Sequence, residues 1–305
     1  MDNCSPGVRQ KLEYRLPPGG CHCISANEQG DVIKLWRHLN TQDLSIALSA
    51  ELASGNVAAF IGAGLSVGAG LPGWYGLINE LAKRVKYEMP PQRWASGDAL
   101  IDAAQFYINT NGLNSLVMFL KDRLDTTGKQ PTAAHQALAR LPISVVFTAN
   151  YDDLLERSYK DAGKRVQVVV NDSSIPFMRR DPGIVNIVKL YGDLDQPETI
   201  VLTRQQYENF FIQRQQMIKL LETELGRSTM LYLGWSHSDP HFNLVLGELS
   251  ARYEQFMRAG YAVLFDVSEA QKHELKRKKI RLVEFPSNQE DKTALLAAWL
   301  NGLWK

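Results

Sequence analysis

Cysteine is scarce in this chain and confined to one end of it. The 305 residues contain three cysteines, Cys4, Cys21 and Cys23, and none follows. An odd number gives no disulfide framework, and the spacing does not match the paired Cys-x-x-Cys pattern of structural zinc sites. We therefore expect a reducing, cytoplasmic location and no metal site; the alternative is a metal held by Cys21, His22 and Cys23 with Cys4.

Long apolar runs and an excess of one charge are also missing. No apolar run approaches the ~18 residues that would suggest a membrane helix, and residues 1–20 lack the apolar stretch of a secretory signal. The formal net charge of +1 gives no reason to expect a membrane or nucleic-acid surface. A local basic cluster is interpreted as the solvated end of a helix before a strand. It contains Lys272, Lys276, Arg277, Lys278, Lys279 and Arg281.

Short apolar runs alternate with helical patterns along most of the chain. Residues 1–40 show little periodicity, and we expect an irregular N-terminal extension there. The predicted strands are 57–61, 144–148, 166–170, 184–190, 230–234, 261–267 and 280–285, and the predicted helices include 41–54, 204–225 and 240–256. Residues 95–140 are helical without a strand and predict a helical insertion. This order predicts an α/β domain over 41–305, a Rossmann-like parallel sheet with helices on both faces.

Polar residues gather where four of the predicted strands end. The polar segments are 62–74, 150–152, 191–193 and 234–239. Open parallel sheets bind ligands at the carboxyl ends of their strands. We therefore expect the functional site at that edge of the sheet.

A glycine-rich loop follows the first predicted strand and precedes a helix. Gly62 and Gly64 would let backbone amides approach a phosphate, and Ser66 could add a hydroxyl donor. Gly68 comes one residue late for the dehydrogenase pattern G-x-G-x-x-G, and no strand-ending acid follows at the spacing that holds a ribose. The loop therefore predicts a nucleotide but argues against hydride transfer. The alternative is a tight turn without a ligand.

Four segments taken together resemble the SIR2-like (sirtuin-like) family, and they occur in that family's order. They are Gly62-Ala-Gly-Leu-Ser66 with Gly70-Leu-Pro72, Thr148-Ala-Asn-Tyr-Asp152, Lys189-Leu-Tyr-Gly192, and Leu233-Gly-Trp-Ser236 followed by Asp239-Pro240. The resemblance covers about 57–240 and implies a sirtuin-like fold.

The lack of later cysteines selects a branch of that family. Protein-deacetylating sirtuins carry a four-cysteine zinc module, which a chain without cysteine after Cys23 cannot build. The resemblance is therefore to the zinc-free branch of bacterial antiphage defence systems. It implies an NAD glycohydrolase that uses NAD as substrate, without zinc, and depletes NAD in infected cells. It also implies homo-oligomers and partners such as a HerA-type ATPase, an Argonaute-like protein or another defence subunit.

The resemblance also implies roles for individual residues. Asn150 would hold the water or the ribose hydroxyls, Asp152 would orient Asn150 or stabilise the ribosyl cation, and Tyr191 would contact the ribose. The expected NAD-binding residues are Gly62, Ala63, Gly64, Ser66, Pro72, Trp74, Gly234, Ser236 and Asp239. For Asn150 and Asp152, the alternative is a turn that leaves a strand.

Tyr191 stands where the family has its catalytic histidine. A phenol with a pKa near ~10 stays protonated at neutral pH, although it can still orient a hydroxyl group. Three explanations stay open: Tyr191 positions the substrate, another group such as His237 or His241 is the base, or the chain is inactive. We expect His135 to be structural, and helix-start positions are the other interpretation of His237 and His241. The competing functions are a non-catalytic module that binds NAD or ADP-ribose, and an ADP-ribosyltransferase.

Overall fold

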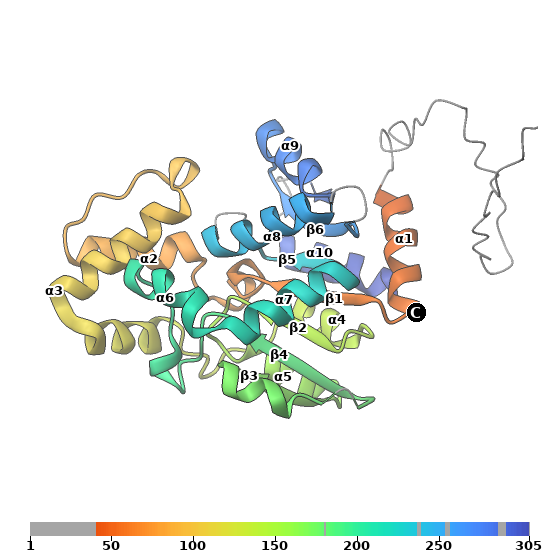
Figure 1. Cartoon of the computed structure of the whole chain (residues 1–305), viewed down its shortest axis with the longest axis horizontal. Helices are drawn as coiled ribbons and strands as arrows, with labels where there is room; N and C mark the ends of the chain where they lie inside the picture. The colour runs from red at the N-terminus through yellow and green to blue at the C-terminus, as the bar shows by residue number, and fades with distance from the viewer. Residues whose placement is uncertain (1–40, 180, 237–238, 254–256, 286–290, 305) are drawn as a thin grey trace, which may run out of the picture. The chain divides into compact units, whose positions relative to one another are not determined.

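The computed structural model describes residues 41–179, 181–236, 239–253, 257–285 and 291–304 (Figure 1). The extension expected for residues 1–40, its three cysteines and His237 lie outside the described residues. None of the described helices is long and apolar enough to cross a membrane.

Seven parallel strands form one sheet in the described chain. They are β1 (Val57–Ile61), β2 (Val145–Thr148), β3 (Arg165–Val169), β4 (Ile184–Lys189), β5 (Thr229–Leu233), β6 (Gly260–Phe265) and β7 (Ile280–Phe285). Their order in the sheet is β3-β4-β2-β1-β5-β6-β7. Every pairing is parallel, for example Ile61 beside Thr148 on one side and Leu233 on the other. The predicted parallel α/β sheet is confirmed, with strand ends that shift by one or two residues.

The unbroken apolar sequence of β1 reflects burial on both faces. Ala59 and Ile61 belong to one hydrophobic core, and Ala58 and Phe60 belong to the core on the other face. Successive side chains of a strand point to opposite faces, so a central strand covered on both sides must be apolar at every position.

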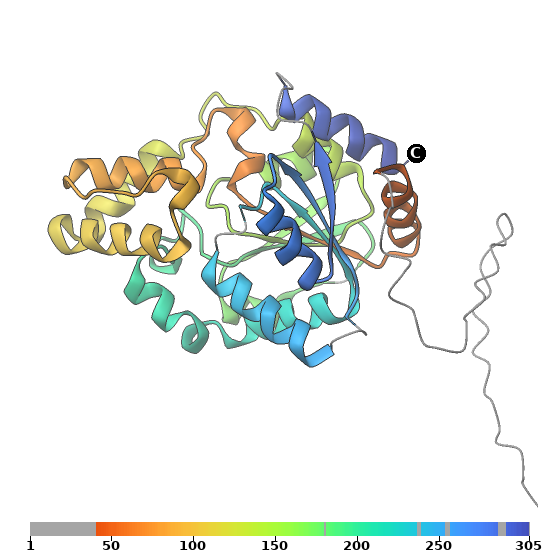
Figure 2. The ribbon, with the colours of Figure 1, turned by 90° about the horizontal axis from the view of Figure 1, so that it is seen from above.

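Helices cover both faces of the sheet, as Figure 2 shows with α10 on one side and α8 on the other. The first layer packs on the core that contains Ala59 and comprises α1 (Thr41–Ala53), α4 (Ala133–Arg140), α5 (Leu154–Asp161) and α10 (Lys292–Leu303). The second layer packs on the core that contains Phe60 and comprises α6 (Arg204–Gln213), α7 (Gln215–Arg227), α8 (Pro240–Tyr253) and α9 (Glu269–Arg277).

A separate helical module stands beside the sheet, at the left of Figure 1. It contains α2 (Trp74–Arg84) and α3 (Gly97–Arg123), which share a third hydrophobic core with Ile200 and Leu202. The chain turns inside α3 at Gly112, whose φ of 80° favours glycine. The helical insertion expected at 95–140 is thus divided by packing: α3 belongs to this module, whereas α4 lies on the sheet.

The helical sequence predicted over 204–225 is confirmed, and the structure divides it into two helices that meet at Arg214. The Arg214 side chain is buried, and its guanidinium donates hydrogen bonds to the backbone carbonyls of Val170 and Thr199. A guanidinium in this position needs acceptors, and the break between α6 and α7 lets Arg214 reach them.

The basic cluster of 272–281 ends a helix before a strand, as predicted. Lys272 pairs with Glu269 and Glu284, and Arg277 pairs with Glu274. Lys278 differs because it is buried, and its ammonium donates to Asn243 at 2.9 Å. These local pairs offset part of the charge of the cluster.

Candidate active site

The candidate site lies where the strand order reverses. From β1 the chain continues to β2 on one side, and β5 later pairs with the other side of β1. In open α/β sheets, ligands bind outside the carboxyl ends of the strands at such a switch point. Polar residues were predicted from the sequence in the loops after β1, β2, β4 and β5.

The glycine loop after β1 packs backbone to backbone on the loop after β5. The amides of Gly62 and Gly64 donate to the carbonyls of Leu233 at 2.9 Å and Gly234 at 3.0 Å. A Cβ on Gly62 would lie 2.5 Å from the Gly234 carbonyl oxygen. Gly234 itself has a φ of +65° and leaves no room for a Cβ beside Leu65. The close contact between the two loops therefore requires these glycines. The backbone amides of Gly62 and Gly64, which were expected to bind a phosphate, already donate hydrogen bonds within the protein.

A chain of three polar side chains joins the loops after β1 and β2. The Ser66 hydroxyl donates to Asp152 Oδ2 at 3.0 Å, and Asn150 Nδ2 donates to the Ser66 hydroxyl at 3.2 Å. All three residues are buried. The Asn150 Oδ1 atom accepts no hydrogen bond from any described residue. A buried acceptor without a donor is costly, so this oxygen is suited to accept a hydrogen bond from a bound molecule.

The Asp152 carboxylate is held in place on both of its oxygens. Besides the bond from Ser66, Oδ1 accepts the backbone amide of Leu154 at 3.1 Å. Burial raises the pKa of Asp152, and these two hydrogen bonds and the charge of Lys189 partly offset that rise. Such fixation is typical of a group that acts on charge at a set position.

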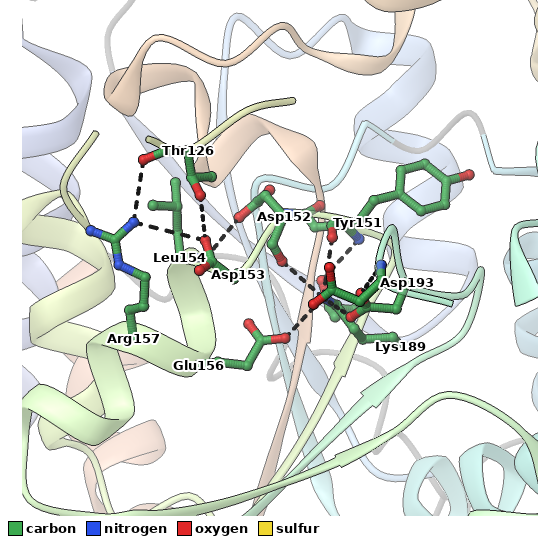
Figure 3. Close-up of polar contacts among 12 residues, drawn as sticks. Thr126, Tyr151, Asp152, Asp153, Leu154, Glu156, Arg157, Lys189 and Asp193 are labelled. Carbon is green, nitrogen blue, oxygen red and sulfur yellow. Dashed lines mark hydrogen bonds and ion pairs between the residues drawn. The ribbon is translucent and has the colours of Figure 1, made fainter. Parts of the chain in front are cut away.

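Lys189 links the loops after β2 and β4 through a buried ion cluster (Figure 3). Its ammonium contacts Glu156 Oε1 at 2.9 Å and Asp193 Oδ2 at 2.6 Å. It also donates to the carbonyls of Tyr151 at 3.2 Å and Asp152 at 3.0 Å. Burial alone would lower the pKa of Lys189, but the two carboxylates outweigh it and raise the pKa. The cation therefore holds the backbone next to Asn150.

This cluster was not predicted from the sequence. Lys189 was quoted within a family segment without a role, Asp193 only as part of the polar segment 191–193, and Glu156 not at all. The available signal was a charged residue, Glu156, among the buried positions of a short helix that also buries Leu154, Leu155 and Tyr159.

Tyr191 and Asp239 form a second buried pair at the same edge of the sheet. The Tyr191 hydroxyl donates to Asp239 Oδ2 at 2.5 Å. The ring of Tyr191 stacks on Tyr207, with ring centroids 5.4 Å apart, and lies against Phe210. Burial, followed by the charge of Asp239, raises the pKa of Tyr191 well above its ordinary value. Tyr191 is therefore protonated at neutral pH.

The two described histidines near these segments differ in surroundings. His135 is fully buried, caps α4 together with Thr132, and has its pKa lowered to about 4 by burial; the structural role predicted for it is confirmed. His241 stacks on Tyr207 and Phe210, and burial lowers its pKa to about 4. His241 is neutral at physiological pH, and its Nδ1 has no hydrogen-bond partner among the described residues.

The remaining expected NAD-binding residues come from the loop after β1, the start of α2 and the loop after β5. Trp74 begins α2 and packs between the second and third cores. Ala63 and Pro72 are half-buried, and Ser236 is exposed. The structure thus joins Ser66 to Asn150 and Asp152, and it joins Tyr191 to Asp239.

The described residues hold no group of three or more His, Cys, Asp or Glu side chains arranged for a metal ion. Cys4, Cys21 and Cys23 lie outside that part of the chain.

Comparison with known proteins finds a family domain in part of the chain. Residues 144–283 match the family model described as a SIR2-like domain. "NAD(+) hydrolase ThsA" of Acinetobacter baumannii (strain 532279) is 31% identical over 221 residues, which make up 72% of this chain and 44% of the relative. "Defense-associated sirtuin 2" of Bacillus subtilis is 23% identical over 196 residues, 63% of this chain and 19% of that protein. This chain therefore spans less than half the length of either relative.

A solved structure has the same fold. It is a Sir2 homologue mutant in complex with ADP-ribose, 15% identical, with a TM-score of 0.51, and the likeness covers 84% of this chain and 95% of the other. The fold is thus a sirtuin-like Rossmann fold, as the sequence predicted. Residues 144–283 of the chain thus form a SIR2-like domain.

Proposed function

We propose that this chain is an NAD⁺ glycohydrolase, which cleaves NAD⁺ into nicotinamide and ADP-ribose. The observation that carries the proposal is the buried Asn150 side chain, held by Ser66 beside Asp152 at the switch point, with Oδ1 left without a donor among the described residues. The names of relatives that are 29–31% identical, all NAD(+) hydrolases, support the same activity. The solved structure of the same fold is a complex with ADP-ribose, which supports a nucleotide as the ligand.

Cleavage of NAD⁺ requires little from the protein beyond positioning the reactants and stabilising charge. The nicotinamide–ribose bond is weak because the leaving group is cationic, and its cleavage passes through an oxocarbenium-like state. Asn150 Oδ1 accepts a hydrogen bond from the attacking water or a ribose hydroxyl. The Asp152 carboxylate, fixed by Ser66 and Leu154, stabilises the positive ribose or holds Asn150 in place.

The other residues expected to bind NAD have different roles around this centre. We propose that Ala63, Ser66, Pro72 and Trp74 contact the dinucleotide, and that Ser236 contacts the adenosine ribose. Gly62, Gly64 and Gly234 contribute by letting the two loops interlock, which leaves the phosphates to other amides near the start of α2.

Alanine variants of two buried asparagines test the proposal. The purified chain is incubated with NAD⁺, and nicotinamide and ADP-ribose are followed by chromatography. We expect both products from the unaltered chain and a loss of at least about 100-fold in kcat with Asn150→Ala, the scale of removing one transition-state contact. Asn186→Ala is the matched control, because Asn186 is also buried but lies within β4. Asn150→Ala with unchanged kcat would contradict the assignment.

A binding module without catalysis is the second candidate, and one contact favours it. The Tyr191 hydroxyl is committed to Asp239 and has its pKa raised, so it does not act as a free base. This candidate predicts bound but uncleaved NAD⁺ in the same assay. A modified protein or nucleic-acid acceptor would instead indicate an ADP-ribosyltransferase.

We place this activity in bacterial antiphage defence, in the cytoplasm, as NAD depletion by a homo-oligomer that works with a partner such as a HerA-type ATPase. The family resemblance and the name of the Bacillus subtilis relative support this setting. Expression in bacteria challenged with phage, with Asn150→Ala as the control, tests the defence role. Light scattering after size-exclusion chromatography tests the assembly, and a monomer at high concentration would contradict it.

A further inference from the structure

Asp239 is a buried carboxylate that the proposed mechanism does not use. Its Oδ2 accepts the Tyr191 hydroxyl at 2.5 Å, and its Oδ1 accepts the backbone amide of Phe242 at 3.1 Å. Its own carbonyl accepts the amide of Asn243, so Asp239 caps the start of α8. The residue is 6% exposed. Both oxygens are thus occupied within the protein, which argues against the contact with NAD that the sequence predicted for Asp239.

The position of Tyr191 opposite Asp239 is set by its own loop. The carbonyl of Tyr191 accepts the amide of Val201 at 2.9 Å. The next residue, Gly192, has a φ of +91° and packs so closely on Thr199 that a Cβ would overlap the Thr199 carbonyl. The stacked ring of Tyr207 then leaves the Tyr191 ring little freedom. The backbone of this loop therefore positions Tyr191 for its short hydrogen bond to Asp239.

Hydrogen bonds hold the Asp239 carboxyl group in place. No cation among the described residues pairs with it. Burial raises its pKa to about 6, while bonds from Tyr191, Phe242 and the His241 backbone lower it in part. The other titratable groups that interact with this pair are Tyr207 from α6, Tyr151 from the loop after β2 and, acting on Tyr191, Arg214. The His241 ring stacks on Tyr207. Of these, the Tyr151 and Tyr207 phenols have raised pKa values and the His241 ring a lowered one. Within the described chain, Asp239 is thus the member of this group that titrates near neutrality.

We propose that Asp239 is the proton acceptor in NAD⁺ cleavage and that it acts through the Tyr191 hydroxyl. This inference rests on the function proposed above. Tyr191 alone is a poor base because an ordinary phenol has a pKa near ~10. Paired with a carboxylate, it can take a proton from one side while it gives its own to the other.

Cleavage breaks one bond and forms one bond at the same ribose carbon. The bond between the ribose carbon and the nicotinamide nitrogen breaks, and its electron pair stays on that nitrogen. The oxygen of water bonds to the same ribose carbon. One proton of the water passes to the Tyr191 oxygen as the Tyr191 proton passes to Asp239 Oδ2. Asp239 then releases the proton to solvent, so the products are nicotinamide, ADP-ribose and H⁺.

The pH dependence of kcat tests the proposal. Only the deprotonated carboxylate accepts a proton, so kcat rises with pH through a value near 6. It is about tenfold lower at pH 5 than at pH 7, as one titrating group with that pKa requires. With Asp239→Asn, we expect kcat at pH 7.5 to fall at least about 100-fold and this dependence to disappear. The Asn side chain can still accept the Phe242 amide, so α8 keeps its cap.

Asp172→Asn is the matched control for the loss of a carboxylate at a helix start. Asp172 accepts the amides of Gln216 and Met217 at the start of α7 and does not contact Tyr191. We expect this variant to keep the kcat of the unaltered chain and its rise near pH 6.

A double-mutant cycle separates a proton path from a structural role. If Asp239 acts through Tyr191, Tyr191→Phe and Asp239→Asn lower kcat by similar factors, and the double variant is hardly slower than either. Factors that multiply would overturn the proposal. So would Asp239→Asn with an unchanged kcat and pH profile, or a His237→Gln variant that loses the rise near pH 6. Absence of NAD⁺ cleavage by the unaltered chain at every pH would remove the proposed function as well, whereas the other outcomes remove this inference alone.

Discussion

Lys189 is a buried cation that is shielded from water. The side chain is 1% exposed, and four oxygen atoms from Glu156, Asp193, Tyr151 and Asp152 surround its ammonium. A buried ion pair adds little net stability compared with apolar residues, but the loss of one partner leaves an uncompensated charge. Two carboxylates depend on this single cation.

Replacement of Lys189 by methionine should therefore destabilise the chain by about 3–5 kcal/mol at pH 7. Without the ammonium, the pKa of Glu156 rises further above its unfolded value. Protonation then relieves the penalty, so the loss shrinks as the pH falls toward 5 and grows as it rises. Urea denaturation at several pH values measures both effects.

The exposed pair between Lys272 and Glu284 provides the comparison. Lys272→Met should leave the free energy of unfolding nearly unchanged, because solvent screens such pairs. Equal losses in the two variants would show that the ions around Lys189 are not buried in solution.

At the scale of single residues, motifs located most of the candidate site but not its contacts. Ser66, Asn150 and Asp152 were placed at strand ends from the sequence, and the structure joins them by hydrogen bonds. The bond between Tyr191 and Asp239 was not predicted, because a single sequence does not reveal which side chains of distant segments touch.

At the scale of elements, the loops after β1 and β5 depend on each other for their shape. Gly62 and Gly64 face Gly234 at distances that leave no room for a side-chain atom. Neither loop could keep its path if the other moved, and the loop after β1 carries Ser66.

Gly62→Ala should thus cost about 1–3 kcal/mol of stability, the usual penalty of overpacking, and lower NAD⁺ cleavage by displacing Ser66. Gly247→Ala is the matched control, because Gly247 lies in α8 with open space around it. That change should stabilise the chain by about 0.5–1 kcal/mol. Thermal unfolding of both variants checks the signs, and a Gly62→Ala chain as stable as the unaltered one would refute the interlock.

Elements with a clear apolar period were predicted well, and breaks within helices were not. The strands follow runs such as 57–61, whose burial on both faces demands apolar residues. The break between α6 and α7 escaped prediction because it depends on where Arg214 finds its acceptors, Val170 and Thr199. The short helix α5 also carries too few turns to show a period.

At the scale of the whole molecule, the candidate site draws on four loops that surround one point of the sheet. Its residues are buried and bonded to one another. A ligand that binds the folded chain and not the unfolded one raises the stability of all the elements that build the site.

NAD⁺ should accordingly stabilise the Asn150→Ala chain, which we expect to bind without turnover. At a concentration 100 times the Kd, the gain is about 2.7 kcal/mol. Differential scanning fluorimetry with increasing NAD⁺ measures the rise in Tm. Adenine alone should give a smaller shift, and an absence of any shift with NAD⁺ would contradict dinucleotide binding.

The amino-acid sequence alone decides the local features of this protein: apolar strands, glycine turns and polar strand ends, because each depends on neighbours in the chain. The tertiary structure decides the strand order β3-β4-β2-β1-β5-β6-β7 and the pairs that this order creates. Ser66 meets Asp152 across 86 positions, and Tyr191 meets Asp239 across 48. Such contacts form only when separate segments pack on a common core, and no local pattern encodes which segments those are.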